Sequence, residues 1–228
     1  MVERLIVPLD GRRETLAAFP VAEALAKRLS ASLTALVVAV PAMGSWEDEI
    51  WLKEHATSDE VPVDRVVVLA DDVVGTILGR AEDPGAVLCL SSHGRTGVGA
   101  ALLGSVSEEV LGRSTKEVVV VGPRTSPPAE LDAVLICVDD ETSASVVEAG
   151  RRWAEALGAR PVVVTAERTD GDPATTLLDR AERERAGLVV AGAHQHVGFE
   201  RFLLGSVSQA LVRRSTVPVL LVNPAAPA

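Results

Sequence analysis

Short apolar runs alternate with longer amphipathic stretches along the first 121 residues. The runs are rich in Val, Leu and Ala and predict strands buried on both faces, and the amphipathic stretches predict covering helices. We expect strands at 4–10, 32–40, 64–69, 86–91 and 117–121, and helices near 13–30, 46–56, 72–82 and 105–113. This alternation predicts an α/β fold with an open parallel sheet and right-handed crossovers.

The chain then repeats itself. Residues 102–107, Leu-Leu-Gly-Ser-Val-Ser, recur as residues 203–208, and strand-like runs that end in Asp10 and Asp139 begin the two copies. Between the copies, residues 122–130 contain three prolines, which can neither continue a helix nor donate to a sheet. We therefore expect two tandem domains, at 1–126 and 127–228.

The second copy is the shorter one. From the strand-end aspartate to the repeated glycine, the first copy takes 94 positions and the second takes 66, a loss of 28 residues. That loss equals about one helix and one strand. After a strand at 160–166 the chain runs through residues 170–173 directly into a helix at 174–186. The second copy is expected to lack an edge strand and its helix.

Composition limits the function. The formal net charge of −10 has the wrong sign for a non-specific nucleic-acid binder, and no run of about 20 apolar residues predicts a membrane span. The first residues lack the pattern of a signal peptide. Cys89 and Cys137 each fall within a predicted buried strand and are interpreted as reduced core thiols. These features favour a cytoplasmic protein without nucleic-acid or membrane partners.

Candidate chemistry follows the fourth strand. A glycine-bearing loop leads to Gly104 and Ser105, which open a helix whose free amides and dipole would favour an anion. A simpler interpretation is that Ser105 and Ser206 only cap their helices. The two standard nucleotide motifs, G-x-x-x-x-G-K-[ST] and G-x-G-x-x-G after the first strand, are absent from the sequence.

The chain resembles the universal stress proteins. That family carries G-x2-G-x9-G-[ST] after the fourth strand and an aspartate at the end of the first. The corresponding motifs here are Ser91-x2-Gly94-x9-Gly104-Ser105 and Gly192-x2-Gln195-x9-Gly205-Ser206, with the strand-end aspartates Asp10 and Asp139.

The resemblance implies the strand order 3-2-1-4-5 in each domain and pairing of the two halves as a pseudo-dimer. It also implies binding of ATP, with or without Mg²⁺, by a regulatory stress-response module that has no dedicated catalysis. In the first copy the implied ATP-binding residues are Asp10, Val38, Gly94, Gly104, Ser105, Val106 and Ser107. In the second, weaker site they are Asp139, Gly192, Gly205, Ser206, Val207 and Ser208.

Each copy departs from the family motif once. Ser91 replaces the leading glycine of the first copy, and Gln195 replaces the middle glycine of the second. Gln195 would be strained if that position needs a positive φ, and Asp140 adds a negative charge where the first copy has Gly11. We therefore rank the first site above the second.

Other chemistry finds less support in the sequence. His194 and His196 form an H-x-H without a local carboxylate or cysteine, so they are interpreted as loop residues and no metal site is expected. Arg95 is either a phosphate contact or a solvated arginine. No G-x-S-x-G elbow is present, and we expect no enzyme activity. A dimerisation scaffold without nucleotide and a slow ATPase remain the alternatives, and a further homodimer of whole chains stays open.

Overall fold

The computed structural model describes residues 1–40, 46–92, 103–138, 143–165, 172–193 and 204–223. The first half contains β1 (Arg4–Leu9), α1 (Arg13–Leu16), α2 (Ala18–Leu29), β2 (Ser32–Ala39), α3 (Trp46–His55), β3 (Val63–Leu69), α4 (Val73–Ala81), β4 (Ala86–Ser91), α5 (Ser105–Arg113) and β5 (Val118–Val121). The second half contains β6 (Ala133–Val138), α6 (Ser143–Leu157), β7 (Arg160–Thr165), α7 (Pro173–Arg183), β8 (Ala186–Gly192), α8 (Ser206–Arg214) and β9 (Val219–Val222).

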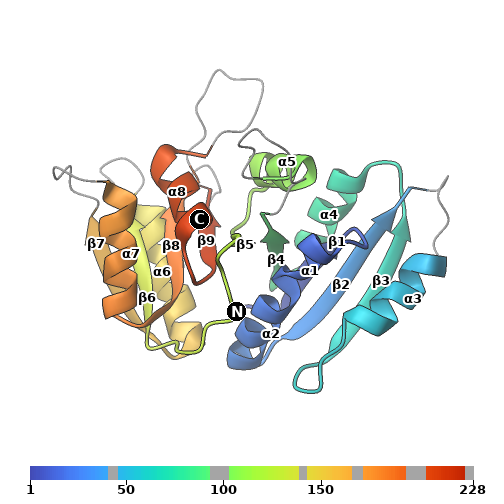
Figure 1. Cartoon of the computed structure of the whole chain (residues 1–228), viewed down its shortest axis with the longest axis horizontal. Helices are drawn as coiled ribbons and strands as arrows, with labels where there is room; N and C mark the ends of the chain where they lie inside the picture. The colour runs from blue at the N-terminus through green and yellow to red at the C-terminus, as the bar shows by residue number, and fades with distance from the viewer. Residues whose placement is uncertain (41–45, 93–102, 139–142, 166–171, 194–203, 224–228) are drawn as a thin grey trace.

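All nine strands of the described chain form one sheet, in the order β3-β2-β1-β4-β5-β9-β8-β6-β7 (Figure 1). The first half has the expected order 3-2-1-4-5, with parallel neighbours. The halves do not form separate sheets, because β5 pairs antiparallel with β9, with Val119 opposite Leu220. This single antiparallel pair joins two parallel halves into one open α/β sheet.

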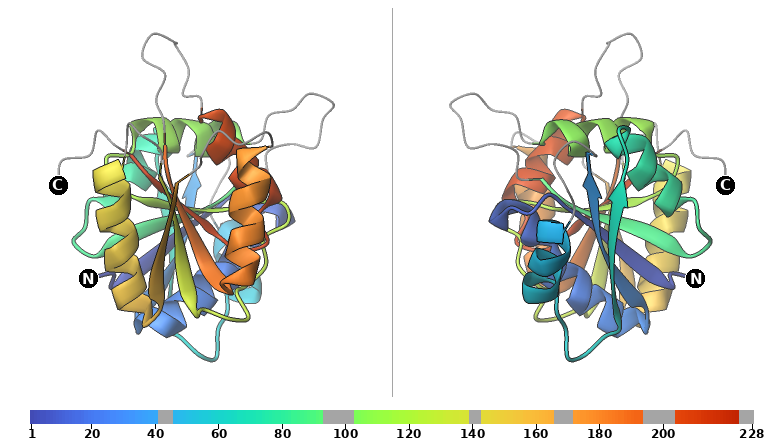
Figure 2. Two further views of the ribbon diagram at one scale, coloured as in Figure 1. Left: turned by 90° about the vertical axis from the view of Figure 1, so that its left-hand side faces the viewer. Right: turned by 90° about the vertical axis from the view of Figure 1, so that its right-hand side faces the viewer.

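Helices cover both faces of the sheet, as the expected fold requires (Figure 2). Alternate strand residues enter two apolar cores: Leu5 and Val7 lie in one with α2, α3 and α6, and Ile6 lies in the other with α4, α5, α7 and α8. Because both faces are covered, the strands are apolar at nearly every position rather than at every second one.

The expected helix at 13–30 is two helices, α1 and α2, with Ala17 between them. The break has a local cause in Pro20, which has no backbone N–H to donate to the carbonyl of Leu16, four residues earlier. The expected helix at 174–186 ends earlier, at Arg183, because Arg185 adopts a positive φ of 51°.

Among the described residues of the second half, no strand pairs with the outer edge of β7, which ends the sheet. In the first half the corresponding strand β2 is covered by β3. Val163 of β7 is therefore 46% exposed, whereas Ala35, which has the same register on β2, is fully buried. The shortening that the sequence indicated thus falls at this edge.

The outer edge of β7 contains a proline that hinders pairing with a further strand. Arg160 donates its backbone N–H inward to the carbonyl of Asp132, so the next residue, Pro161, faces outward along the parallel ladder. A proline there removes one donor that an incoming strand would need.

Both cysteines are buried and free, as expected. Burial raises the pKa of the thiol of Cys89 and of Cys137 to about 12, which keeps both protonated and unreactive at neutral pH. None of the helices that the structure describes combines the length and the apolar character needed to cross a membrane.

Candidate functional site

The start of α5 presents backbone donors that the helix itself does not use. Gly104 is the N-cap residue, with extended backbone angles and no side chain to cap the helix. The first bond of the helix runs from the amide of Glu108 to the carbonyl of Gly104, at 2.8 Å. The amides of Ser105, Val106 and Ser107 precede that bond and have no acceptor within the helix. Together with the exposed hydroxyl of Ser105, these amides can hold an anion.

Two serine hydroxyls tie the end of β4 to the start of α5 and to α1. The Ser107 hydroxyl donates to the carbonyl oxygen of Ser91 at 3.1 Å, and the Ser91 hydroxyl donates to the carbonyl oxygen of Glu14 at 2.9 Å. The proton of the Ser107 hydroxyl is thus committed to the protein. What Ser107 can donate to a phosphate is its backbone N–H.

The second copy repeats this geometry at β8 and α8. Gly205 is the N-cap residue, the amide of Gln209 donates to its carbonyl at 2.9 Å, and the Ser208 hydroxyl donates to the carbonyl of Gly192 at 2.7 Å. The amides of Ser206 and Val207 therefore lie as those of the first copy do. One difference concerns charge, because α5 carries Glu108 in its first turn and α8 has Gln209 there.

Asp10 follows β1 and stands half-exposed at the carboxyl edge of the sheet. Its Oδ1 accepts from the Thr15 hydroxyl at 2.8 Å and from the backbone N–H of Arg12 at 3.1 Å. Its Oδ2 lies 3.7 Å from Nε of Arg12. The carboxylate therefore orders the turn before α1, and its second oxygen keeps acceptor capacity for a ligand.

Val38 lies near the carboxyl end of β2, opposite Val68 of β3, and is half-buried. Because β2, β1 and β4 are parallel neighbours, the structure brings Val38, Asp10 and the end of β4 to one edge of the sheet. Ligands of open α/β sheets bind at such edges.

Other expected residues fall outside the described ranges. They are Gly94, Arg95, Asp139, Asp140, His194, Gln195 and His196.

One further group beside this site has no signature in the sequence. Ser92, directly after β4, is 1% exposed, and its Oγ has no hydrogen-bond partner within the described chain. The second copy has Ala193 at this position. Comparing the copies residue by residue marks Ser92 as a difference, but only the structure shows that its hydroxyl is buried.

Among the described residues, no group of three or more His, Cys, Asp or Glu side chains is placed so that it could hold a metal ion. The donors at the start of α5 are neutral amides and a hydroxyl, which suit an anion rather than a cation.

Both halves of the chain match one protein family, and the fold is known from solved structures. A model of the universal stress protein family matches residues 1–122 and again residues 126–223. A universal stress protein of Methanocaldococcus jannaschii is 34% identical over 107 residues, which make up 46% of this chain and 61% of that protein. One from Mycolicibacterium smegmatis is 25% identical, and the match covers 96% of this chain and 97% of that protein.

Among solved structures, a universal stress protein from Archaeoglobus fulgidus has a TM-score of 0.68 at 18% identity. The match covers 97% of this chain and 98% of that one. This likeness concerns the fold.

Proposed function

We propose that this chain, which belongs to the universal stress protein family, is a regulatory module that binds ATP in its first half. The observation that carries the proposal is the start of α5, where three backbone amides without a helical acceptor and the exposed Ser105 hydroxyl share a sheet edge with Asp10 and Val38. No general base or nucleophile is assigned there, so we propose binding without dedicated catalysis.

The donor set fits the parts of an adenine nucleotide. The helix start offers N–H groups and a positive dipole end to the phosphates, and any Mg²⁺ would be held chiefly by those phosphates. Oδ2 of Asp10, which lies beside Arg12 but keeps acceptor capacity, can accept from the exocyclic amine of adenine, and the half-buried Val38 supplies an apolar contact.

The antiparallel pair of β5 and β9 supports a second part of the proposal, that the halves act as a pseudo-dimer. The same pair favours the rival function, a scaffold that binds no nucleotide. Glu108 also argues for that rival, because a negative charge in the first turn of α5 weakens its attraction for phosphate. Two buried, free thiols suit a reducing compartment, and we propose the cytoplasm.

Gly104→Asp tests the site without breaking the helix. Aspartate is a favoured N-cap residue, and the φ of −67° and ψ of 156° at Gly104 suit any residue, so the helix is expected to be at least as stable. Its carboxylate would occupy the amides and repel phosphate. Calorimetric titration should show ATP–Mg²⁺ affinity falling by more than about tenfold, with circular dichroism and the melting temperature retained.

Gly205→Asp is the matched control, because it makes the same change at the start of α8. It should leave the first-half affinity unchanged. Gently purified protein should also release adenine nucleotide on denaturation. If the parent chain neither carries nucleotide nor binds ATP up to about millimolar concentration, the scaffold function replaces the proposal. Phosphate release that persists in Gly104→Asp would identify a contaminating ATPase.

A further inference from the structure

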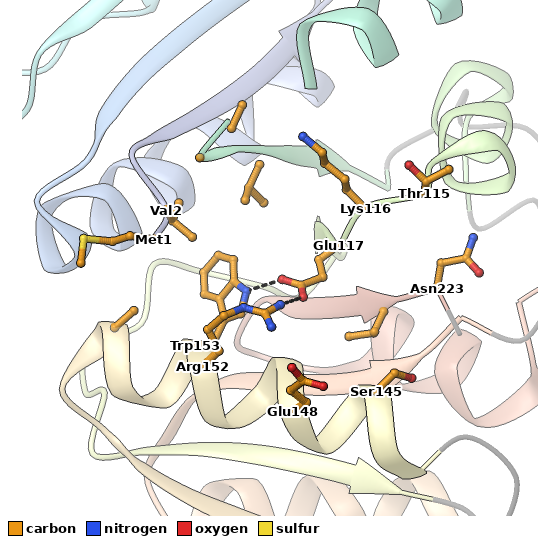
Figure 3. Close-up of a pocket in the computed structure, with 15 residues that line it drawn as sticks. Met1, Val2, Thr115, Lys116, Glu117, Ser145, Glu148, Arg152, Trp153 and Asn223 are labelled. Atoms are coloured by element: carbon orange, nitrogen blue, oxygen red, sulfur yellow. Dashed lines mark hydrogen bonds and ion pairs between the residues drawn. The ribbon is translucent and has the colours of Figure 1, made fainter. Parts of the chain in front are cut away.

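A pocket of about 350 Å³ lies where the two halves meet, away from the start of α5 (Figure 3). Its walls from the first half are the segments that precede β1, β4 and β5, and its walls from the second half are α6 and the end of β9. Pockets that bind small molecules begin at about this volume and are common at domain junctions.

One carboxylate from the first half is bound by the second half in this pocket. Oε2 of Glu117 accepts from the indole Nε1 of Trp153 at 2.7 Å, and Oε1 is paired with the Arg152 guanidinium. The repeat has nothing similar at its corresponding positions, which are Pro218 for Glu117 and the buried Leu25 for Trp153. The pocket chemistry therefore comes from this sequence and not from the fold alone.

Both cationic side chains of the pocket are already used, and the other cation among the lining residues is the α-ammonium of Met1, which is 97% exposed. Arg152 is paired with Glu117, and the Lys116 ammonium donates to the backbone carbonyls of Ala81 and Asp83, the latter at 3.3 Å. An anionic ligand would have to compete with these partners. The pocket is thus unsuited to the nucleotide proposed for the other site.

The one charged side chain of the pocket that is left without a partner in the described chain is negative. Glu148 lines the pocket from α6 and is exposed, and among the described residues its carboxylate makes no hydrogen bond or ion pair (Figure 3). The lining also includes the apolar residues Val2, Val87, Ala156 and Val222, beside polar ones such as Thr115, Ser145 and Asn223. Such a pocket complements a molecule with one cationic group and an apolar body.

We propose that this junction pocket binds a small organic amine, with its ammonium at Glu148 and its apolar body between α6 and the start of β4. The ligand would contact both halves of the chain at once. Because the ligand binds only when the two halves are docked, it would stabilise their docked arrangement. The pocket would then be a second ligand site of the regulatory module, independent of the ATP site.

The test uses three probes of one shape: 2-phenylethylamine, 2-phenylethanol and phenylacetate. Titration of the whole chain, followed by NMR and thermal shift, should rank the amine first, the alcohol second and the carboxylate last. Glu148→Gln should weaken the amine about fivefold, to the level of the alcohol, and leave the alcohol unchanged. Ala156→Phe should fill the pocket and abolish binding of all three.

Glu155→Gln is the matched control, since Glu155 is an exposed carboxylate on the same helix that does not line the pocket. It should change nothing beyond a small long-range effect that salt removes. The proposal is wrong if the amine binds no better than phenylacetate, if Glu148→Gln retains the preference for the amine, or if Ala156→Phe binds as the parent does. ATP titration of the same variants should be unaffected, so failure here leaves the nucleotide proposal standing.

Discussion

At the scale of single residues, Glu117 depends on the other half of the chain. Its side chain is 18% exposed, and its carboxylate meets the Trp153 indole N–H and the Arg152 guanidinium. A carboxylate that is mostly buried needs such hydrogen-bond donors, because removing its charge from water without them costs free energy. Trp153 is itself 1% exposed and packs in the core beneath α6, so its ring is held in place to donate.

Trp153→Phe should destabilise the chain by about 1–3 kcal/mol, because it leaves one oxygen of Glu117 short of a donor and a small gap beside the core. Urea unfolding measures the loss. The double variant Trp153→Phe with Glu117→Gln should recover part of it, since a neutral amide needs the indole less. If Trp153→Phe costs as much in the Glu117→Gln background as in the parent, packing alone is responsible.

At the scale of elements, both helices α4 and α7 begin with a capping aspartate. Asp72 accepts from the amide of Gly75 at 2.8 Å, and Asp172 accepts from the amide of Ala174 at 3.2 Å. Asp172 has further donors, the Arg214 guanidinium from α8 and the Thr175 hydroxyl at 2.9 Å. These links tie the start of α7 to the end of α8.

Hydrogen bonds from Arg214 and Thr175 hold the pKa of Asp172 below its ordinary value. A lowered folded-state pKa adds stability above the unfolded-state pKa, and this stability is lost as the pH falls through the folded-state pKa. Asp172→Asn keeps a capping oxygen. It should therefore lower the free energy of unfolding most at neutral pH and least in acid. Urea unfolding across the acid range measures this, with Asp179→Asn on the same helix as the control. A difference that is constant with pH would contradict the assignment.

Most elements were predictable because their cause is local. Apolar runs indicated the strands. The 28-residue difference in length between the copies predicted that the second half lacks an edge strand, and among the described residues β7 is indeed the last strand of the sheet. The break at Ala17 could also have been inferred from Pro20, which removes one helical donor. The candidate anion site at the start of α5 was expected from Gly104. The hydrogen bond from the Ser107 hydroxyl to Ser91 joins positions 16 apart, so it could be seen only in the fold.

At the scale of the whole molecule, the sequence does not show that the two sheets form one. β5 and β9 are both short runs of Val and Leu, and the sequence of such a run does not indicate which strand it pairs with. The contact between Glu117 and Trp153 is equally hidden, since it depends on how the halves dock. The junction pocket, which follows from that docking, could not be predicted from sequence.

The contact between the two halves leaves no room for a side chain at Gly122, which directly follows β5. A Cβ at Gly122 would lie 1.8 Å from the backbone carbonyl oxygen of Val212 in α8, and backbone cannot move aside as a flexible side chain can. Gly122→Ala should therefore push the halves apart and destabilise the chain by about 1–3 kcal/mol or more. Calorimetry should show the single unfolding transition of a continuous sheet broaden or divide in two.

Gly79→Ala is the matched control, because a Cβ at Gly79 in α4 meets nothing within 4 Å. That change should stabilise the chain by about 0.5–1 kcal/mol through helix propensity alone. ATP binding in the first half should survive Gly122→Ala, whereas amine binding in the junction pocket should weaken, because only the pocket needs both halves in place. If Gly122→Ala were as stable as the parent and bound the amine equally well, the β5–β9 junction would not be what holds the halves together.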